Sequence, residues 1–244
     1  MRAVRRTLGA VTLIAILLAG ALLLYAAARK RPQDMPWTKL DLSQPVGLFT
    51  GRKLTALTSD FPACRGLLDR AGVRFESLPP VSDGQCGYAD AVRLADGGAR
   101  SIDLIPQRVG MACPVAAALM LWEWQVLQPA ARRHFGPGVR VSRIDHFGSY
   151  SCRRMYGRSE GAFSEHSTAD ALDVAGFVLS DGTSIRLVND WQDDGAKGAF
   201  LREVRDGACD LFATVLSPDY NAAHADHFHL DQAERGAMGW RACR

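Results

Sequence analysis

The sequence predicts an α+β domain in which helices flank a small antiparallel sheet, with disulfide staples and one N-terminal transmembrane helix. Three observations predict it. An apolar run of 21 residues, from Leu8 to Ala28, carries no charge and is long enough to cross a bilayer. All six cysteines follow this run, and an even count in an exported chain indicates disulfides. Beyond residue 60, apolar residues at helical spacing mix with short alternating stretches that favour strands.

The composition fits one globular domain behind the N-terminal run. The chain has 244 residues, of which 48% are hydrophobic and 23% charged, and its net charge is +3. Part of that charge comes from arginines beside the apolar run, and no basic patch with interleaved aromatic residues follows. We therefore expect no nucleic-acid partner. The sequence leaves the oligomeric state open.

The chain divides into three parts. Residues 1–30 are predicted as a signal anchor, because the apolar run exceeds the usual core of a cleaved signal, although small residues near its end leave cleavage open. Residues 31–60 contain several prolines and no period, and are predicted as a tether and entry segment. Residues 61–244 form the folded domain. The cysteines place this domain in the periplasm, or otherwise outside the cytoplasmic membrane, with the inner membrane as the partner of the N-terminal helix.

The first half of the domain combines helices with a hairpin. A short helix is predicted over residues 61–72. Residues 87–104 are predicted as a hairpin around an Asp-Gly-Gly turn. Residues 114–135 form the main helical region, which Pro129 breaks or restarts, and a strand follows over residues 139–144.

The second half is predicted to alternate between strands and one helix. Residues 171–179 suit a buried strand, and residues 184–188 a second strand after an Asp-Gly turn. Residues 198–216 are predicted as a helix, and residues 227–230 as a final strand.

The six cysteines are structural in this interpretation. No two lie close enough for a CxxC zinc knuckle, and six cysteines allow fifteen pairings. From neighbourhood alone we predict the pairs Cys64–Cys86, Cys113–Cys152 and Cys209–Cys243.

Two short motifs carry the chemistry. Asp173 lies in an apolar strand, seven residues after His166, and an ionised carboxylate there is costly unless a cation or donor compensates it. His227 and His229 are two residues apart, so on a strand they point to the same side. His224 lies just before them. Two imidazoles with a carboxylate fit zinc, and catalytic zinc keeps three protein ligands and an open position. A salt bridge or turn cap at Asp173 is the simpler alternative.

The same residues resemble a known family. The run from Ser164 to Asp173 is similar to the SxHxxGxAxD motif of the zinc D-Ala-D-Ala peptidase and murein endopeptidase superfamily, and His227-Phe-His229 to its terminal HxH motif. Further similarity, in Tyr150-Ser-Cys-Arg-Arg, around Trp191, in Phe200-Leu-Arg and in the run from His224 to Asp231, covers about residues 60 to 244. These segments resemble the bacterial extensin-like C-terminal domain family.

The resemblance implies roles for individual residues. The metal ligands are His166, Asp173 and His229, and the metal is Zn²⁺. His227 acts as the catalytic histidine and His224 assists it. Arg153, with Arg154 as the neighbouring candidate, binds a peptide carboxylate or stabilises the oxyanion; a surface charge beside a disulfide is the alternative for both arginines.

The chain departs from the motif at one position. Ala169 replaces the glycine, which costs stability where the backbone φ is positive.

The expected function is zinc-dependent hydrolysis of amide bonds in peptidoglycan peptides, by an envelope-facing, peptidase-like protein. In this mechanism His227 takes a proton from water and returns it to the leaving amine. The alternative is a non-catalytic cell-envelope binding module that keeps the peptidase fold. A purely structural disulfide domain is a third option, but it does not explain a carboxylate in an apolar strand.

Overall fold

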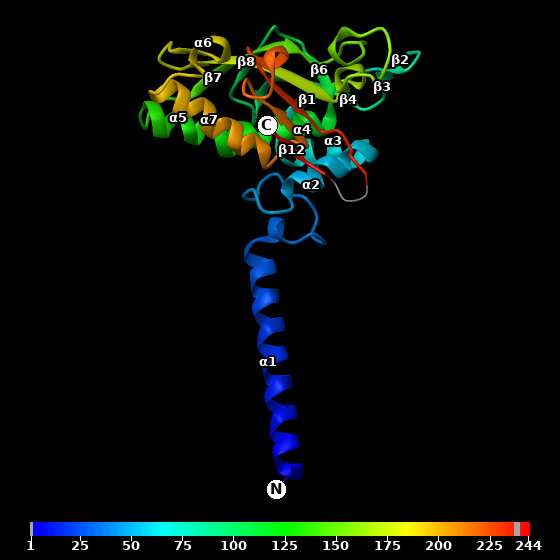
Figure 1. Ribbon diagram of the computed structural model, residues 1–244, viewed down its shortest axis with the longest axis vertical. Coiled ribbons are helices and arrows are strands. Elements are labelled where there is room, and N and C mark those ends of the chain that lie inside the picture. The colour runs from blue at the N-terminus through cyan, green and yellow to red at the C-terminus, as the bar shows by residue number, and fades with distance from the viewer. Residues whose placement is uncertain (1, 237–239) are drawn as a thin grey trace.

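A single long helix, α1 (Arg2–Lys30), leads into an α+β body (Figure 1). The computed structural model describes residues 2–236 and 240–244. The predicted N-terminal helix is confirmed as a helix that is long and apolar enough to cross a membrane. None of its hydrophobic window is buried, and Figure 1 shows it projecting away from the body as a straight rod. By itself, such a helix suits an anchor or a signal sequence.

The body is built on a seven-stranded sheet. Its strands are β5 (Asp103–Ile105), β7 (Val141–Gly148), β8 (Ala171–Leu179), β9 (Ser184–Arg186), β10 (Thr214–Leu216), β11 (Phe228–Asp231) and β12 (Ala242–Cys243). They run in the order β12-β10-β11-β8-β7-β5, with β9 beside β8. The central pairs are antiparallel, as predicted, whereas the two outer pairs, β5–β7 and β10–β12, are parallel.

Two smaller sheets cover one side of the body. The first contains β1 (Val73–Ser77), β4 (Ala91–Gly98) and β6 (Gly110–Ala112), and the second is a hairpin of β2 (Val81–Asp83) and β3 (Cys86–Tyr88). The predicted hairpin over residues 87–104 is wrong. Its first half is β4, which pairs with β1 and β6, while its second half crosses to the main sheet as β5. Ile102, just before β5, and Leu104, within it, are buried in the core, which a hairpin on the surface would not allow.

Helices fill the space against the main sheet. They are α3 (Phe61–Arg70), α4 (Cys113–Trp122), α5 (Gln128–Phe135) and α7 (Ala196–Cys209), with two short helices, α2 (Thr50–Thr55) and α6 (Leu187–Asp190). Every residue of α4 is buried, and Trp122 packs edge-on against Phe177 of β8. Pro129 restarts the helical path rather than breaking it, since it lies in the first turn of α5. A π-helical turn, η3 (Glu123–Leu127), joins α4 to α5 instead, and it accommodates the missing N–H of proline.

Two further boundaries differ from the prediction. The helix predicted over residues 198–216 ends at Cys209, because the chain turns back through hydrogen bonds to the Ala208 carbonyl and enters β10. The strand predicted over residues 184–188 ends at Arg186. Its backbone N–H donates to the Asp190 carboxylate at 2.7 Å, which starts α6.

Residues 31–60 are packed rather than extended. They contain the 3₁₀ turns η1 (Pro32–Asp34) and η2 (Ala56–Ser59) as well as α2. Leu42, Leu54 and Leu57 of this segment belong to the hydrophobic core. The predicted tether and entry segment thus packs against the body through these leucines.

Three disulfides staple the body. Cys209–Cys243 forms as predicted, whereas the other two predicted pairs are wrong, since the structure pairs Cys64 with Cys113 and Cys86 with Cys152. Proximity in the sequence did not predict these two pairs, because the packing of helices and strands determines which cysteines lie close together. α3 lies against α4 and brings Cys64 to the first residue of α4, and β3 lies beside the loop that follows β7.

Candidate metal centre

Two neighbouring strands supply two of the candidate ligands. β8 and β11 pair antiparallel, with Asp173 opposite His229 and Leu172 opposite Leu230. Because side chains alternate along a strand, Asp173 and His229 share one face of the sheet, while the two leucines enter the core behind it. Both polar residues therefore lie on strands, as predicted.

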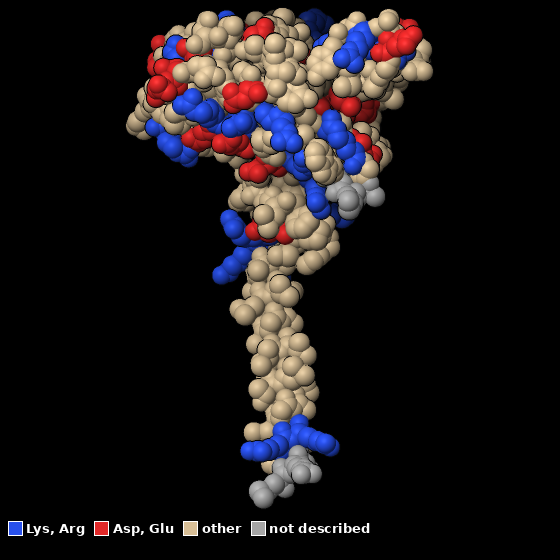
Figure 2. Space-filling view, viewed as in Figure 1, with Lys and Arg blue, Asp and Glu red and all other residues tan. Residues whose placement is uncertain are grey.

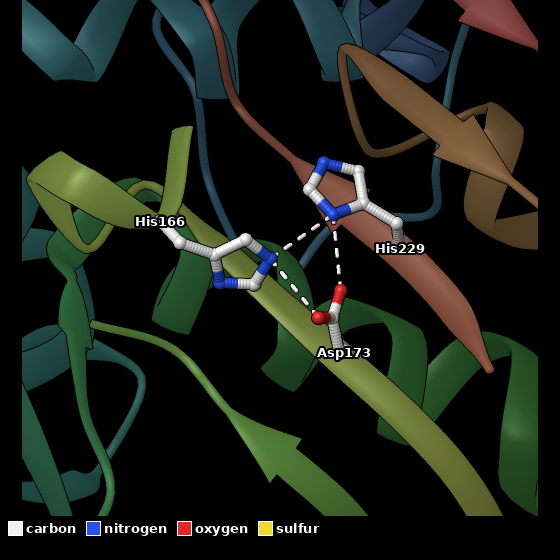
Figure 3. Close-up of side chains that lie close together, drawn as sticks. All are labelled: His166, Asp173 and His229. Atoms are coloured by element: carbon white, nitrogen blue, oxygen red, sulfur yellow. Dashed lines mark hydrogen bonds and ion pairs between the residues drawn. The ribbon is translucent and has the colours of Figure 1, made fainter. Parts of the chain in front are cut away.

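The third candidate comes from a turn before β8. His166 lies in η5 (Glu165–Thr168), and the Ser164 hydroxyl accepts a hydrogen bond from the His166 backbone N–H at 3.4 Å. Nδ1 of His166 donates to the Ser149 carbonyl at 2.6 Å. This bond fixes the ring so that Nε2 points toward Asp173 and His229 (Figure 3).

The three side chains converge on one point. Nε2 of His166 lies 3.1 Å from Oδ2 of Asp173 and 3.2 Å from Nδ1 of His229. Nδ1 of His229 lies 3.0 Å from Oδ1 of Asp173. Ligand atoms in a tetrahedral site with bonds of about 2 Å are roughly 3.3 Å apart, so these separations are close to those of a metal site. The buried His-His-Asp group could hold a metal ion.

Charge is concentrated at this point. Burial opposes a charge on His229, yet hydrogen bonds to Asp173 and Asp231 raise the pKa of the imidazole to about 9. Burial also opposes the charge on Asp173, but hydrogen bonds from His166 and His229 lower the pKa of its carboxyl below the usual range. The Asp173 carboxylate thus pairs with a protonated imidazole. A metal cation can take the place of that proton.

Asp231 is a functional candidate that the sequence analysis missed. It is 1% exposed, and its Oδ2 lies 3.2 Å from Nε2 of His229. A carboxylate there accepts the Nε2–H, which leaves the Nδ1 lone pair free to face the other two ligands. Asp231 follows His229 by two residues on the same strand, so the alternation that paired His227 with His229 also points to it.

The turn between His166 and β8 contains Ala169, at the position where the motif that the sequence resembles has glycine. Ala169 adopts a left-handed conformation, with φ of 59°, and is fully buried. Its carbonyl accepts from the Ala112 N–H at 2.8 Å and from the Ser149 hydroxyl at 3.1 Å, which fixes the turn. The φ is therefore positive, the case in which alanine is strained where glycine is not.

A buried acid follows this turn. Burial, and next the nearby Asp231 carboxylate, raise the pKa of Asp170 well above its usual range, and Oδ1 has no hydrogen-bond partner among the described residues. Both effects oppose a negative charge on Asp170 beside the site.

Two more histidines flank the converging triad. Nε2 of His227 lies 3.6 Å from Oδ1 of Asp173, and Nδ1 of His227 lies 2.8 Å from the Asp226 carboxylate. The ring of His224 lies 5.2 Å from that of His227. Burial, then the neighbouring His227 and His229, lower the pKa of His224 to about 4, so this ring is neutral at pH 7. The structure thus brings all four motif histidines together.

The two candidate arginines separate. Arg153 lines the cavities beside the triad. Arg154 turns away: its guanidinium stacks over Phe163 at 4.3 Å and donates to the Gly161 carbonyl. Arg153 is therefore the arginine placed to meet a ligand.

Cavities open on both sides of the site. One of 570 Å³ is lined by residues that include Tyr156, Tyr220 and Glu165. Another, of 380 Å³, is lined in part by Phe147 and Tyr150. Arg153, Asp173 and His227 border both cavities. An extended ligand lying across these three side chains would have room on either side of them.

Comparison with known proteins gives one match. No curated protein and no solved structure matches the chain. A family model described as Extensin-like protein C-terminus matches residues 62–244, which include the whole site and the six cysteines. The chain therefore belongs to the Extensin-like protein C-terminus family.

Proposed function

We propose that this protein is an envelope-facing zinc-dependent hydrolase of amide bonds in peptidoglycan peptides. The observation that carries the proposal is the convergence of His166, Asp173 and His229 within 3.0 to 3.2 Å. Two imidazoles and one carboxylate suit zinc better than magnesium or calcium, which prefer oxygen ligands. The motif similarity to the zinc D-Ala-D-Ala peptidase and murein endopeptidase superfamily supports the same reaction class.

The metal and the histidines divide the chemistry. When bound, zinc supplies a Lewis acid that activates water and polarises an amide carbonyl. Nδ1 of His227 donates to the Asp226 carboxylate, which leaves Nε2 free to take a proton from water and return it to the leaving amine. His224 is neutral at pH 7 and is placed to orient that water.

Arg153 positions the substrate. Its guanidinium has no hydrogen bond or ion pair with any other described residue, and it lies between the two cavities. It is therefore free to bind a peptide carboxylate or the oxyanion that forms at the reacting carbonyl. Because Arg153 borders both cavities, a peptide held by it would have one cavity on each side of the reacting bond.

The location supports a cell-wall substrate. The apolar helix α1 and the three disulfides fit a body outside the cytoplasm, and we propose that α1 is retained as a membrane anchor. Peptidoglycan peptides are the polymeric amides that an exported, anchored bacterial domain meets.

The test measures zinc and cleavage in the same variants. We expect His166→Ala to lose both zinc and muropeptide cleavage, and His227→Ala to keep zinc but lose cleavage by about 100-fold or more, as for a general base. His134→Ala is the control, since His134 pairs with Glu203 away from the site. Wild-type protein that binds no metal at saturating zinc would contradict the proposal.

One observation favours the runner-up, a non-catalytic envelope binding module. Ala169 holds a left-handed backbone in the ligand-bearing turn, where the family motif has glycine. Binding of zinc and of muropeptides without turnover would favour the binding module over the enzyme.

A further inference from the structure

The segment after α1 joins the helix to the body without a flexible linker. We call residues 31–52 the collar. The Arg31 N–H donates to the Ala27 carbonyl at 2.8 Å, so the hydrogen bonding of α1 continues into the collar. Gln33 is only 2% exposed, and its carbonyl accepts from the Phe49 N–H at 3.0 Å. The two ends of the collar are therefore bound to each other at the point where α1 stops (Figure 1).

Lys53 of α2 binds three residues of the collar. Nζ of Lys53 donates to the Pro32 carbonyl and to Oε1 of Gln33, both at 3.2 Å, and to the Thr38 hydroxyl at 2.8 Å. Burial lowers the pKa of Lys53, because removal from water penalises the charged ammonium. The end of α1 is thus fixed to α2.

α2 connects directly to the strand of the metal centre. Leu54 of α2 is fully buried, and the Thr55 hydroxyl donates to Oε1 of Gln232 at 2.8 Å. Gln232 follows Asp231, the last residue of β11. A short path of packed and hydrogen-bonded residues therefore runs from the end of α1 to the strand that carries His229.

The collar also exposes apolar side chains. Among described residues after α1, the two most exposed large hydrophobic side chains are Leu48, at 84%, and Trp37, at 72%. The same segment carries exposed basic residues: Arg31, which also pairs with Asp34 at 3.6 Å, Lys39, and Arg52, which stacks over the Phe49 ring at 5.9 Å. Apolar and basic side chains together suit a lipid interface and are unfavourable in water.

We propose that the collar is a lipid-binding surface that seats the body on the bilayer. The apolar run Leu8–Ala28 is about 31 Å long as a helix, which matches a hydrocarbon core of about 30 Å. The bilayer boundary then falls at Arg29, and the collar lies in the headgroup layer, where tryptophan is enriched. Trp37 and Leu48 enter this layer, and the basic residues face phospholipid phosphates. Figure 2 shows basic side chains at both ends of the apolar rod, as this placement requires.

Contact between the collar and the bilayer sets the distance of the metal centre from the membrane. Because packed and hydrogen-bonded residues connect α1 to β11, we expect the centre to be held at one distance from the membrane. Its substrates are then restricted to molecules, or parts of a polymer, that lie in the layer next to the bilayer. This inference rests on α1 remaining attached, as proposed above, but not on zinc or catalysis.

The test uses the full chain in nanodiscs of phosphatidylethanolamine and phosphatidylglycerol, with intact mass showing that α1 is present. Lipids brominated near the headgroup end of the acyl chain quench tryptophan that enters the interface. α1 contains no tryptophan, so the span adds no signal. We expect brominated lipid to lower the emission of wild-type protein and not that of Trp37→Phe. Equal quenching of both proteins overturns the proposal.

A matched pair of apolar variants tests the second contact. Leu48→Ser should reduce the quenching of Trp37, because the collar then lies less deeply. Val188→Ser is the control, since Val188 is 63% exposed on α6, far from α1 (Figure 1). Equal effects of the two substitutions would contradict a specific seat. A chain that proves to be cleaved after α1 refutes the anchor and this inference, while leaving the zinc and cleavage tests above unaffected.

Discussion

On one face of the β8–β11 pair, Leu172 and Phe228 pack into the core, whereas on the other face Asp173 and His229 meet across the same backbone register. The apolar face is stabilised by removal of its side chains from water. The polar face is stable only because each buried charge has partners. The first face therefore holds the strands in place, and the second presents Asp173 and His229 to His166 of η5, with the ligand atoms 3.0 to 3.2 Å apart.

The largest effect should come from the polar face. Asp173→Ala removes one proposed ligand and the partner of two imidazoles, and we expect zinc affinity to fall by more than about 100-fold, beyond the range typical of residues that only support a ligand. Titration with zinc against a competing chelator measures it. A loss of less than tenfold would mean that the metal is not bound where these residues converge.

The apolar face should respond differently. Phe228 is fully buried against Trp191, with ring centroids 5.7 Å apart, so Phe228→Ala should lower the free energy of unfolding by about 3–5 kcal/mol. Urea denaturation measures this loss. Zinc affinity of the folded protein should stay within about threefold of wild type. A parallel loss of affinity would show that the two faces are not independent.

The charge of His229 makes zinc binding depend on pH. Its pKa is raised to about 9, above the unfolded value of about 6.5, so the proton stabilises the metal-free fold below pH 6.5. That contribution is lost as the pH rises through 9. Zinc has to displace the proton, so apparent affinity should rise by about tenfold per pH unit from pH 7 and level off near pH 9. Chelator competition at several pH values tests this, and a flat profile would mean that His229 is not a ligand.

Asp231 should have a smaller effect than a ligand. In Asp231→Asn an amide N–H faces Nε2 of His229 and favours the tautomer with a proton on Nδ1, so zinc affinity should fall by about 10–100-fold. Asp226→Asn is the matched control, because Asp226 contacts His227 rather than a proposed ligand. It should lower cleavage and leave zinc affinity unchanged. Equal zinc affinities in Asp231→Asn and wild type would show that Asp231 does not support the metal site.

The smallest effect should come from Ala169. Ala169→Gly relieves a positive φ but loses a buried methyl group, so we expect stabilisation by less than about 1 kcal/mol. Ala117→Gly in α4, also fully buried but in a regular helix, should instead destabilise by about 1 kcal/mol or more. Thermal unfolding compares the two. Similar losses in both would show that methyl packing, not backbone strain, governs the turn.

Local patterns in the sequence predicted the polar face well. A carboxylate in an apolar strand and two histidines at alternate positions are signals within a few residues, and the structure places Asp173 and His229 in register on neighbouring strands. Asp231 was equally accessible to this reasoning, because it lies two residues beyond His229.

Distant pairings were not predictable in the same way. Residues 103–105 pair with β7, and the chain does not fold back on β4. The reason is that Ile102 and Leu104 become buried in the core beside the main sheet. The partners of Cys64 and Cys86 depend on how helices and sheets pack, which sequence spacing does not encode. The collar looked irregular because its order comes from contacts such as those of Lys53, not from a repeating pattern.

The Cys86–Cys152 bond anchors the loop beside the candidate site. Cys152 precedes Arg153, so this bond ties the loop that presents the guanidinium to β3. The proposed ligands lie on η5, β8 and β11, none of which contains a cysteine. The loop nevertheless contacts one of them, because the Ser149 carbonyl accepts from Nδ1 of His166 and the Ser151 N–H donates to the His166 carbonyl. The Cys86–Cys152 bond therefore restrains Arg153 and the His166 turn through one loop, so the oxidation state of these cysteines affects the geometry of the candidate site.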